Sequence, residues 1–208
     1  MSSAALNPQT GKSAIHEIPQ ELDAKGVPPK EIVYCQLSIS TDNGQISLHM
    51  PRRNWVFHHT DIEGLVKTLK DPAANKALTS DEIYSSAGAK TSCDIAIKDT
   101  CYVVLELTGY ANWRFHSDAA AVHMADEHDE SAPDNWGLMH VDADGSHSAD
   151  PVANCQITYF RVSRRAPNSS RPFNFNVEIE DKDHKRAVAI IIDPDTTNTG
   201  QVPPPLPS

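Results

Sequence analysis

The feature that most constrains this chain is a stretch near its C-terminal end, residues 155–193, which reads as three strands. In its middle part, 173–180, phenylalanine, valine and isoleucine alternate with asparagine and glutamate. This period of two is typical of a strand with one face on a core and the other in water. Residues 187–192 are apolar on both faces, so we expect a central strand there, ended at Pro194 because proline has no amide hydrogen to donate.

Other segments look like partners for these strands. Residues 32–50 predict a hairpin, with Asn43 and Gly44 supplying the turn. Thr60 and Glu63 have the spacing of a capping box, which predicts a short helix through Lys70 that ends before Pro72. Residues 72–90 read mainly as loop, with a helical turn at 80–85. Residues 93–97 and 101–107 predict a second hairpin, and 112–115 a further extended segment.

This pattern predicts a mainly β fold: an antiparallel β-sandwich with one short helix and long loops. Strands and helices do not alternate, which argues against a Rossmann-like sheet. We expect three regions: an extended N-terminal arm at 1–30, a single β-sandwich domain at 31–195 and a proline-rich C-terminal tail at 196–208.

Composition excludes several classes of protein. A formal net charge of −10 argues against nucleic acid as a partner, because nucleic-acid binders need a concentrated basic surface. No apolar run is long enough to span a membrane, and the N-terminal residues do not resemble a secretory signal, so we expect a cytoplasmic protein. The four cysteines lack metal-site spacing and are expected to be reduced and buried.

The most unusual segment, 116–150, contains five histidines and nine acidic residues. Imidazole and carboxylate groups are ligands for divalent metal ions, so a metal site is one interpretation. Its candidate ligands are His116, His123, His128, His140, Asp142 and Asp144. The spacings match neither a zinc-protease helix nor an EF-hand loop. The other interpretation is therefore a solvated acidic loop without any cofactor. If the histidines cluster, their protonation would also reduce the negative field.

Positive charge is gathered elsewhere, in an arginine-rich segment without acidic residues. Its members are Arg161, Arg164, Arg165 and Arg171. An arginine loop and an acidic loop on one chain could pair between subunits, which predicts a homo-oligomer with these arginines at its interface. The alternative is that the arginines are solvated or pair within the chain.

Two tryptophans, Trp113 and Trp136, could bind a small-molecule or glycan ligand by stacking, although such residues are more often core or interface anchors. Phosphate binding finds little support. The segment 10–13 resembles the end of a Walker loop, but Leu6 stands where that motif needs glycine. No serine or cysteine has a recognisable catalytic motif around it, so no catalytic residue is assigned.

The predicted strand at 157–162 is followed by a further strand and then by the segment Ile190 to Asp195 and Asn198, with Trp113 to Phe115 upstream. Together these segments resemble the C-terminal half of the bacterial inclusion-body family typified by PixA and AidA. The resemblance implies a self-associating β-sandwich without catalysis. Sequences similar to this chain also carry the description "nucleotide synthetase". From these observations we expect a self-associating cytoplasmic structural or accessory protein. The alternatives are a metal-dependent enzyme that uses segment 116–150, or a carbohydrate-binding, lectin-like module.

Overall fold

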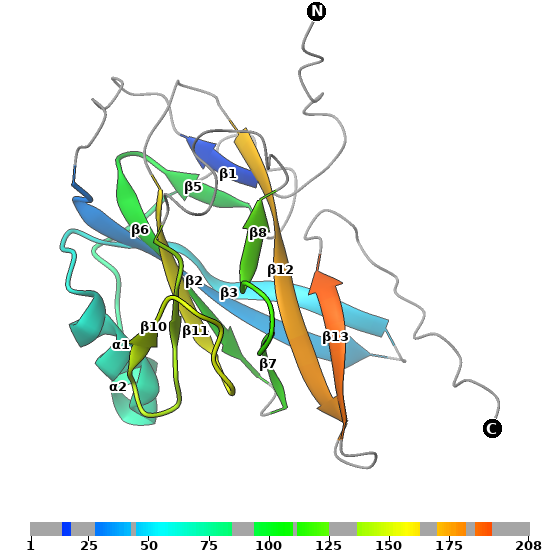
Figure 1. The fold of residues 1–208 in the computed structure, drawn as a ribbon. Coiled ribbons are helices and arrows are strands. Elements are labelled where there is room, and N and C mark those ends of the chain that lie inside the picture. Colours follow the sequence, from blue (N-terminus) through cyan, green and yellow to red (C-terminus); the bar gives the residue numbers. More distant parts are fainter. Residues whose placement is uncertain are drawn as a thin grey trace, which may run out of the picture.

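The computed structural model describes residues 14–17, 28–42, 45–84, 94–109, 112–124, 137–162, 170–181 and 186–192. Within them the chain forms two β-sheets and two short helices (Figure 1). The predicted mainly β class is therefore confirmed. The prediction of an antiparallel fold with one helix is wrong, because two strand pairs are parallel and a second helix follows the first. The sandwich arrangement stays a prediction.

A seven-stranded sheet has the strand order β10-β9-β11-β6-β2-β3-β4. Its strands are β2 (Glu31–Asp42), β3 (Gln45–Phe57), β4 (Glu82–Ile83), β6 (Cys101–Thr108), β9 (Met139–Val141), β10 (His147–Ser148) and β11 (Ile157–Val162). β2 and β3 form the antiparallel hairpin that the sequence predicts. β2 also pairs in parallel with β6, which places Gln36 opposite Glu106. Paired residues of parallel strands share a face, so these two polar side chains lie side by side.

A six-stranded sheet is built around β12. Its strands are β1 (Ala14–Glu17), β5 (Ile95–Ile97), β7 (Trp113–Phe115), β8 (Val122–Met124), β12 (Ser170–Asp181) and β13 (Arg186–Ile192). β1, β8 and β7 pair with successive parts of β12, and β13 also pairs with it. Among the described residues β13 pairs with β12 alone, and Ile191 is 67% exposed. The expected central position of this strand is therefore wrong.

The second predicted hairpin is also wrong, because β5 and β6 lie in different sheets. β5 pairs in parallel with β1, whereas β6 lies between β11 and β2. The helical turn predicted at 80–85 is replaced at Glu82–Ile83 by the edge strand β4. Ser85 lies outside the described residues. These segments are short and apolar, so their local pattern did not reveal which strand they would pair with.

Both sheets contribute to one buried hydrophobic cluster. Leu37 of β2 and Leu105 of β6 come from the seven-stranded sheet, and Phe173 and Phe175 of β12 from the other. The phenylalanine positions confirm the alternation seen in the sequence. The other face of the seven-stranded sheet forms a second cluster, which includes Tyr34 and the helix α1.

Two helices, α1 (Ile62–Lys70) and α2 (Pro72–Ala77), follow β3. Asp61, one residue after the predicted cap, accepts a hydrogen bond from the Gly64 N–H. Asp71 ends α1 and also caps α2, where its carboxylate accepts from two backbone N–H groups. Because an N-cap satisfies amide donors that have no partner inside the helix, Asp71 allows a new helix to begin where the sequence predicted loop.

Asn54 links strands of both sheets near their shared core. It is buried and has a φ of 56°, a left-handed conformation that asparagine tolerates better than most residues. Its side chain accepts a hydrogen bond from the Ala96 N–H and donates one to the Tyr84 carbonyl. Through these two side-chain hydrogen bonds, Asn54 holds β3 against the segments around β4 and β5.

Several expectations about the chain as a whole concern parts that are only partly described. Of the predicted arm, β1 is paired within a sheet, and the tail at 196–208 lies outside the described residues. Cys35, Cys101 and Cys155 are buried, as expected, whereas Cys93 lies outside the described residues. In the described part of the chain, no helix is long and apolar enough to cross a membrane.

Candidate functional site

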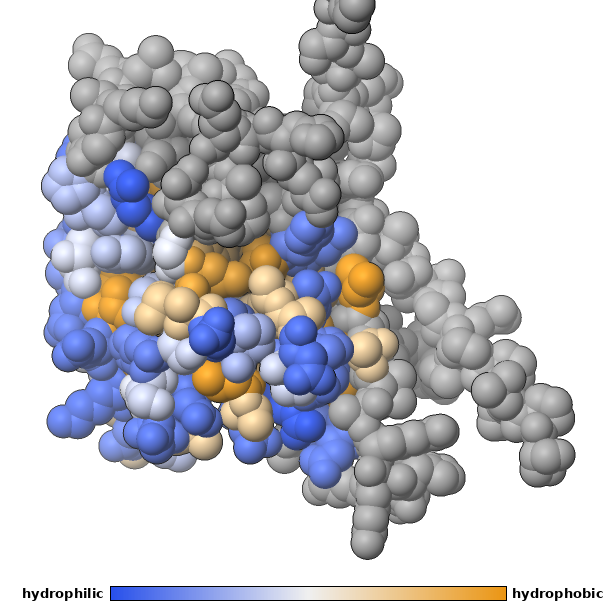
Figure 2. Space-filling model, viewed as in Figure 1, coloured by the Kyte–Doolittle hydropathy of each residue, from blue (hydrophilic) through white to orange (hydrophobic). Residues whose placement is uncertain are grey.

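A polar pocket of about 460 Å³ lies where the end of α1 meets one end of both sheets. Its lining includes residues of α1 and β7, two elements in the lower half of the view in Figure 1. Its charged and amide-bearing lining residues are Lys70, Glu106, Asn112, Arg114, Asp142, Asn154, Gln156 and Glu180. On the face in Figure 2, hydrophilic residues predominate where the helices lie. This pocket is the candidate functional site because it gathers ionisable groups from both sheets.

Glu106 forms one wall of the pocket and is only 6% exposed. The hydroxyl of Tyr34 and the amide of Gln36, both on the neighbouring strand β2, donate to its Oε2. Asn75 of α2 donates from Nδ2 to Oε1 at 2.9 Å. A buried carboxylate is stable only when such donors compensate for lost water. The parallel pairing of β2 with β6 and the capped start of α2 therefore place Glu106.

A second layer of contacts orients these donors. Arg52 donates from Nη1 to Oδ1 of Asn75 at 2.5 Å and from Nη2 to its backbone carbonyl at 2.7 Å. This leaves the amide nitrogen of Asn75 directed at Glu106 and at the Leu69 carbonyl. Burial, then the negative charge of Glu106, raises the pKa of Tyr34 far above its ordinary value, so its hydroxyl remains a donor.

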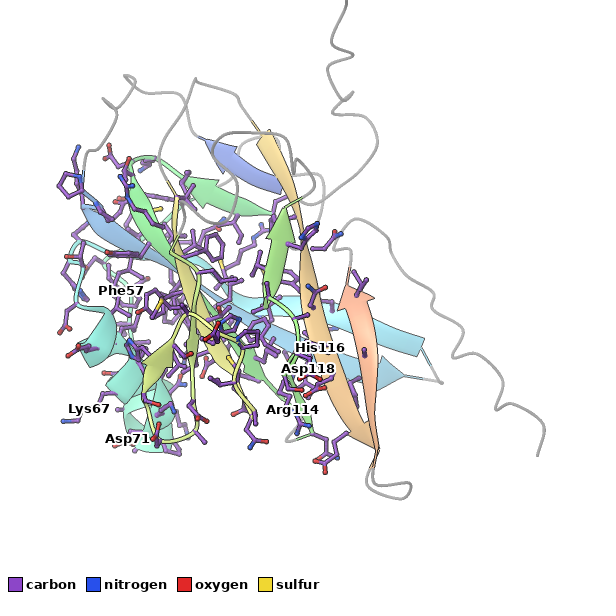
Figure 3. All side chains as sticks on the ribbon, viewed as in Figure 1. Phe57, Lys67, Asp71, Arg114, His116 and Asp118 are labelled. Carbon is purple, nitrogen blue, oxygen red and sulfur yellow. The ribbon has the colours of Figure 1, made fainter. Side chains whose placement is uncertain are left out.

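Arg114 of β7 also lines the pocket and lies beside β12 (Figure 3). Its Nε donates to Glu178 at 2.5 Å, and its Nη1 lies 4.0 Å from a carboxylate oxygen of Glu180. Nη1 also donates to Asn154 at 3.3 Å. Glu178 is 4% exposed, so the carboxylate of this ion pair is shielded from solvent, whereas the Arg114 side chain is 23% exposed. The β7–β12 pairing, which sets Arg114 opposite Glu178, explains the contact.

The third wall joins the end of α1 to the loop after β9. Lys70 donates from Nζ to the backbone carbonyl of Asp142. The Asp142 carboxylate accepts from the next backbone N–H, and its carbonyl accepts from that of Gly145, whose φ is 95°. Glycine adopts this conformation without strain, which lets the loop turn back over α1. The pocket thus brings together carboxylates, amides and two cations.

The predicted metal ligands are spread over several elements. His116 follows β7 and accepts a hydrogen bond from the Asp118 N–H, and His123 lies on β8. Asp142 lines the pocket, whereas Asp144 caps its own exposed turn. His128 lies outside the described residues. Within the described ranges, no three histidine, cysteine, aspartate or glutamate side chains are close enough to hold a metal ion.

Of the predicted ligands that the structure describes, His140 alone is buried, at 1% exposure on β9. Its Nε2 accepts a hydrogen bond from the Ala121 N–H at 3.2 Å, so the proton of the neutral ring is on Nδ1. Burial lowers the pKa of this imidazole, although the carbonyls of Ser148 and Ala149 and the charge of Asp150 partly oppose the shift. His140 therefore links β9 to the segment before β8.

The predicted arginine interface is described only in part. Arg161 is partly buried on β11, and the backbone of Arg171 pairs with β1. Arg164 and Arg165 lie outside the described residues. The oligomer that these arginines would form stays a prediction.

The two tryptophans predicted to bind a ligand have different outcomes. Trp113 lines the pocket, but it is 1% exposed and its indole N–H donates to the Thr108 carbonyl. That environment is typical of a core anchor rather than an open stacking surface. Trp136 lies outside the described residues. The glycan or small-molecule ligand stays a prediction.

Sequence reasoning missed Glu106, Arg114 and the amides around them. One signal was present: Glu106 is the only charged residue in the apolar strand segment 101–107. A carboxylate inside a strand buried on both faces requires donors nearby, and these came from distant parts of the chain.

Comparison with known proteins bears on the function. A family model described as "predicted novel nucleotide synthetase" matches residues 17–201. Because that description is of an enzyme, the expectation of a self-associating structural protein without catalysis is corrected. The comparisons do not support the resemblance to the inclusion-body family, and a search of curated proteins found no match. Since the matched residues make up most of the 208, the chain belongs to the family of predicted novel nucleotide synthetases.

Proposed function

We propose that this chain is a nucleotide synthetase whose substrate binds in the pocket beside Glu106. The observation that carries the proposal is a nearly buried carboxylate that forms part of the pocket wall, held by three side-chain donors. A group fixed in this way is preorganised, because its orientation does not have to be found again when substrate binds.

Glu106 is the candidate general base. A synthetase joins two groups, and a nucleophilic hydroxyl or amine that attacks must lose a proton. Tyr34 and Gln36 both donate to Oε2, whereas among the described residues Oε1 accepts a side-chain hydrogen bond from Asn75. Oε1 therefore retains lone-pair capacity for a substrate proton.

The test of this proposal measures binding first. The full chain is titrated calorimetrically with ribonucleosides and ribonucleotides. We expect Lys70→Gln to change the binding affinity by about threefold or more, because Lys70 lines the pocket and its ammonium group donates to the Asp142 carbonyl of the neighbouring wall. Lys67→Gln is the matched control, since Lys67 lies in the same last turn of α1 and is exposed like Lys70, but does not line the pocket. Equal effects of both substitutions would contradict this placement of the substrate.

Turnover provides the second readout. Glu106→Gln should reduce nucleotide turnover by about 10²-fold or more, as expected when a general base is lost. The amide it introduces would face donors, so circular dichroism and denaturation must first establish that the variant is folded. A folded Glu106→Gln protein with unchanged turnover would refute the assigned role.

A further inference from the structure

The charge of the pocket indicates which part of a nucleotide it can hold. The described lining contains three carboxylates, from Glu106, Asp142 and Glu180, and two cations, from Lys70 and Arg114. The formal balance is therefore negative by one unit. A polyphosphate carries several negative charges, so this lining would repel it at short range, where salt screens little.

Both cations are already engaged by groups of the protein. Arg114 lies between Glu178 and Glu180, with distances of 2.5 Å and 4.0 Å to their carboxylate oxygens. Lys70 donates to the carbonyl of Asp142. Drawing Arg114 away onto a phosphate would break its contacts and leave the buried Glu178 carboxylate without its charge partner. Such a loss is costly, because a buried charge depends on compensation.

The remaining lining suits an uncharged, polar and partly flat group. Asn154 and Gln156 can each donate and accept, the pattern by which amides pair with the edge of a nucleic-acid base. Leu69, Val141 and Ile157 supply apolar contact. Carboxylates such as Glu106 accept hydrogen bonds from sugar hydroxyls or exocyclic amines.

We propose that the pocket binds the nucleoside part of its substrate, base and sugar, and leaves the phosphate groups toward solvent. This inference rests on the proposed function, since it assigns the part of the nucleotide that occupies the same site. It gives the chain a specificity for the base, and it implies that a phosphate chain adds little to affinity unless a divalent cation accompanies it.

The experiment compares each nucleoside with its own triphosphate on the full chain. Adenosine, guanosine, cytidine and uridine, their triphosphates and inorganic triphosphate are titrated calorimetrically at physiological salt with EDTA. We expect at least one nucleoside to bind, its triphosphate to bind no more than about threefold more tightly, and inorganic triphosphate not to compete. A triphosphate more than tenfold tighter than its nucleoside, or competition by inorganic triphosphate, overturns this inference and leaves the proposed function standing. Absence of binding by every nucleoside and nucleotide overturns both.

One substitution sharpens the comparison. Glu180→Gln removes a negative charge beside Arg114, and Glu180 has a side chain that is 47% exposed. The ratio of triphosphate to nucleoside affinity should rise about threefold, because several phosphate charges feel the lost carboxylate across a distance near the Debye length. Glu82→Gln, with a 40% exposed side chain on β4 and outside the pocket lining, is the matched control. A ratio that changes equally in both variants contradicts the charge argument.

Discussion

Lowering the pH should destabilise this protein through His140. The imidazole is 1% exposed, and its Nε2 accepts the Ala121 N–H. Protonation would place a proton on that acceptor and set two donors against each other. Burial lowers the pKa of His140 below 6.5 in the folded chain, whereas the unfolded chain titrates near the ordinary value. Lowering the pH from 7.5 to 5.5 should therefore reveal the effect of His140 on stability.

The sign and the size of this change in the free energy of unfolding follow from proton binding. Above pH 6.5 neither state binds this proton, so the contribution of His140 to stability is fully present. As the pH falls from 6.5 toward the folded-state pKa, the unfolded chain takes up a proton that the folded chain does not. The free energy of unfolding then decreases by up to about 1.4 kcal/mol per pH unit, a factor of about ten in the folding equilibrium.

The assay is urea denaturation at pH 7.5, 6.5 and 5.5, followed by tryptophan fluorescence or circular dichroism. Other groups titrate in this range, so the wild type is compared with His140→Gln. The amide oxygen of glutamine can accept the Ala121 N–H but does not titrate. We expect the stability of His140→Gln relative to wild type to improve between pH 6.5 and 5.5, by up to about 1 kcal/mol.

A second variant controls for the loss of a histidine. His59 also accepts a backbone N–H, from Asp61, but it is exposed. His59→Gln should follow the wild-type pH dependence. If the stability of His140→Gln relative to wild type stays constant from pH 7.5 to 5.5, or if His59→Gln shows the same change, the argument from burial is wrong.

Three further substitutions test other parts of the structure. Burial raises the pKa of Glu31, which is 4% exposed. Relative to wild type, Glu31→Gln should therefore gain free energy of unfolding as the pH rises above 4.5, because glutamine does not ionise. Urea titrations should show no such trend for Glu82→Gln, whose side chain is more exposed. Asp71→Ala removes two cap hydrogen bonds of α2 and should cost about 1 kcal/mol, with Lys76→Ala as the exposed control; equal losses would argue against the cap. Asn54→Ala and Asn54→Gly lose the same hydrogen bonds, but alanine also strains a φ of 56°, so thermal denaturation should find the alanine variant less stable by about 1 kcal/mol.

Elements with a strong local pattern were predictable from the sequence. The alternation at 173–180 appears as β12, with Phe173 and Phe175 in the core. The hairpin around Asn43 and Gly44 appears as β2 and β3, although those two turn residues lie outside the described part. The first helix begins within two residues of its predicted cap. In each case neighbours along the chain supply the deciding interactions.

The candidate site was not predictable in the same way. Glu106 and Gln36 are 70 residues apart, and they meet only because β2 and β6 pair in parallel. Asn75 reaches Glu106 from the second helix, in a segment for which the sequence predicts loop. The composition of 116–150 predicts metal ligands among its histidines and aspartates, yet of these ligands in the described residues only Asp142 lines the pocket.

Local sequence is enough to predict that strands dominate, which face of β12 is buried and where the first helix begins, because periodicity and capping depend on residues a few positions apart. Tertiary structure decided that β5 and β6 separate into two sheets, that β13 lies at an edge and that Glu106 acquires three donors. Those outcomes depend on pairing between distant segments, where competing partners of similar apolar character differ only in how well the whole core packs.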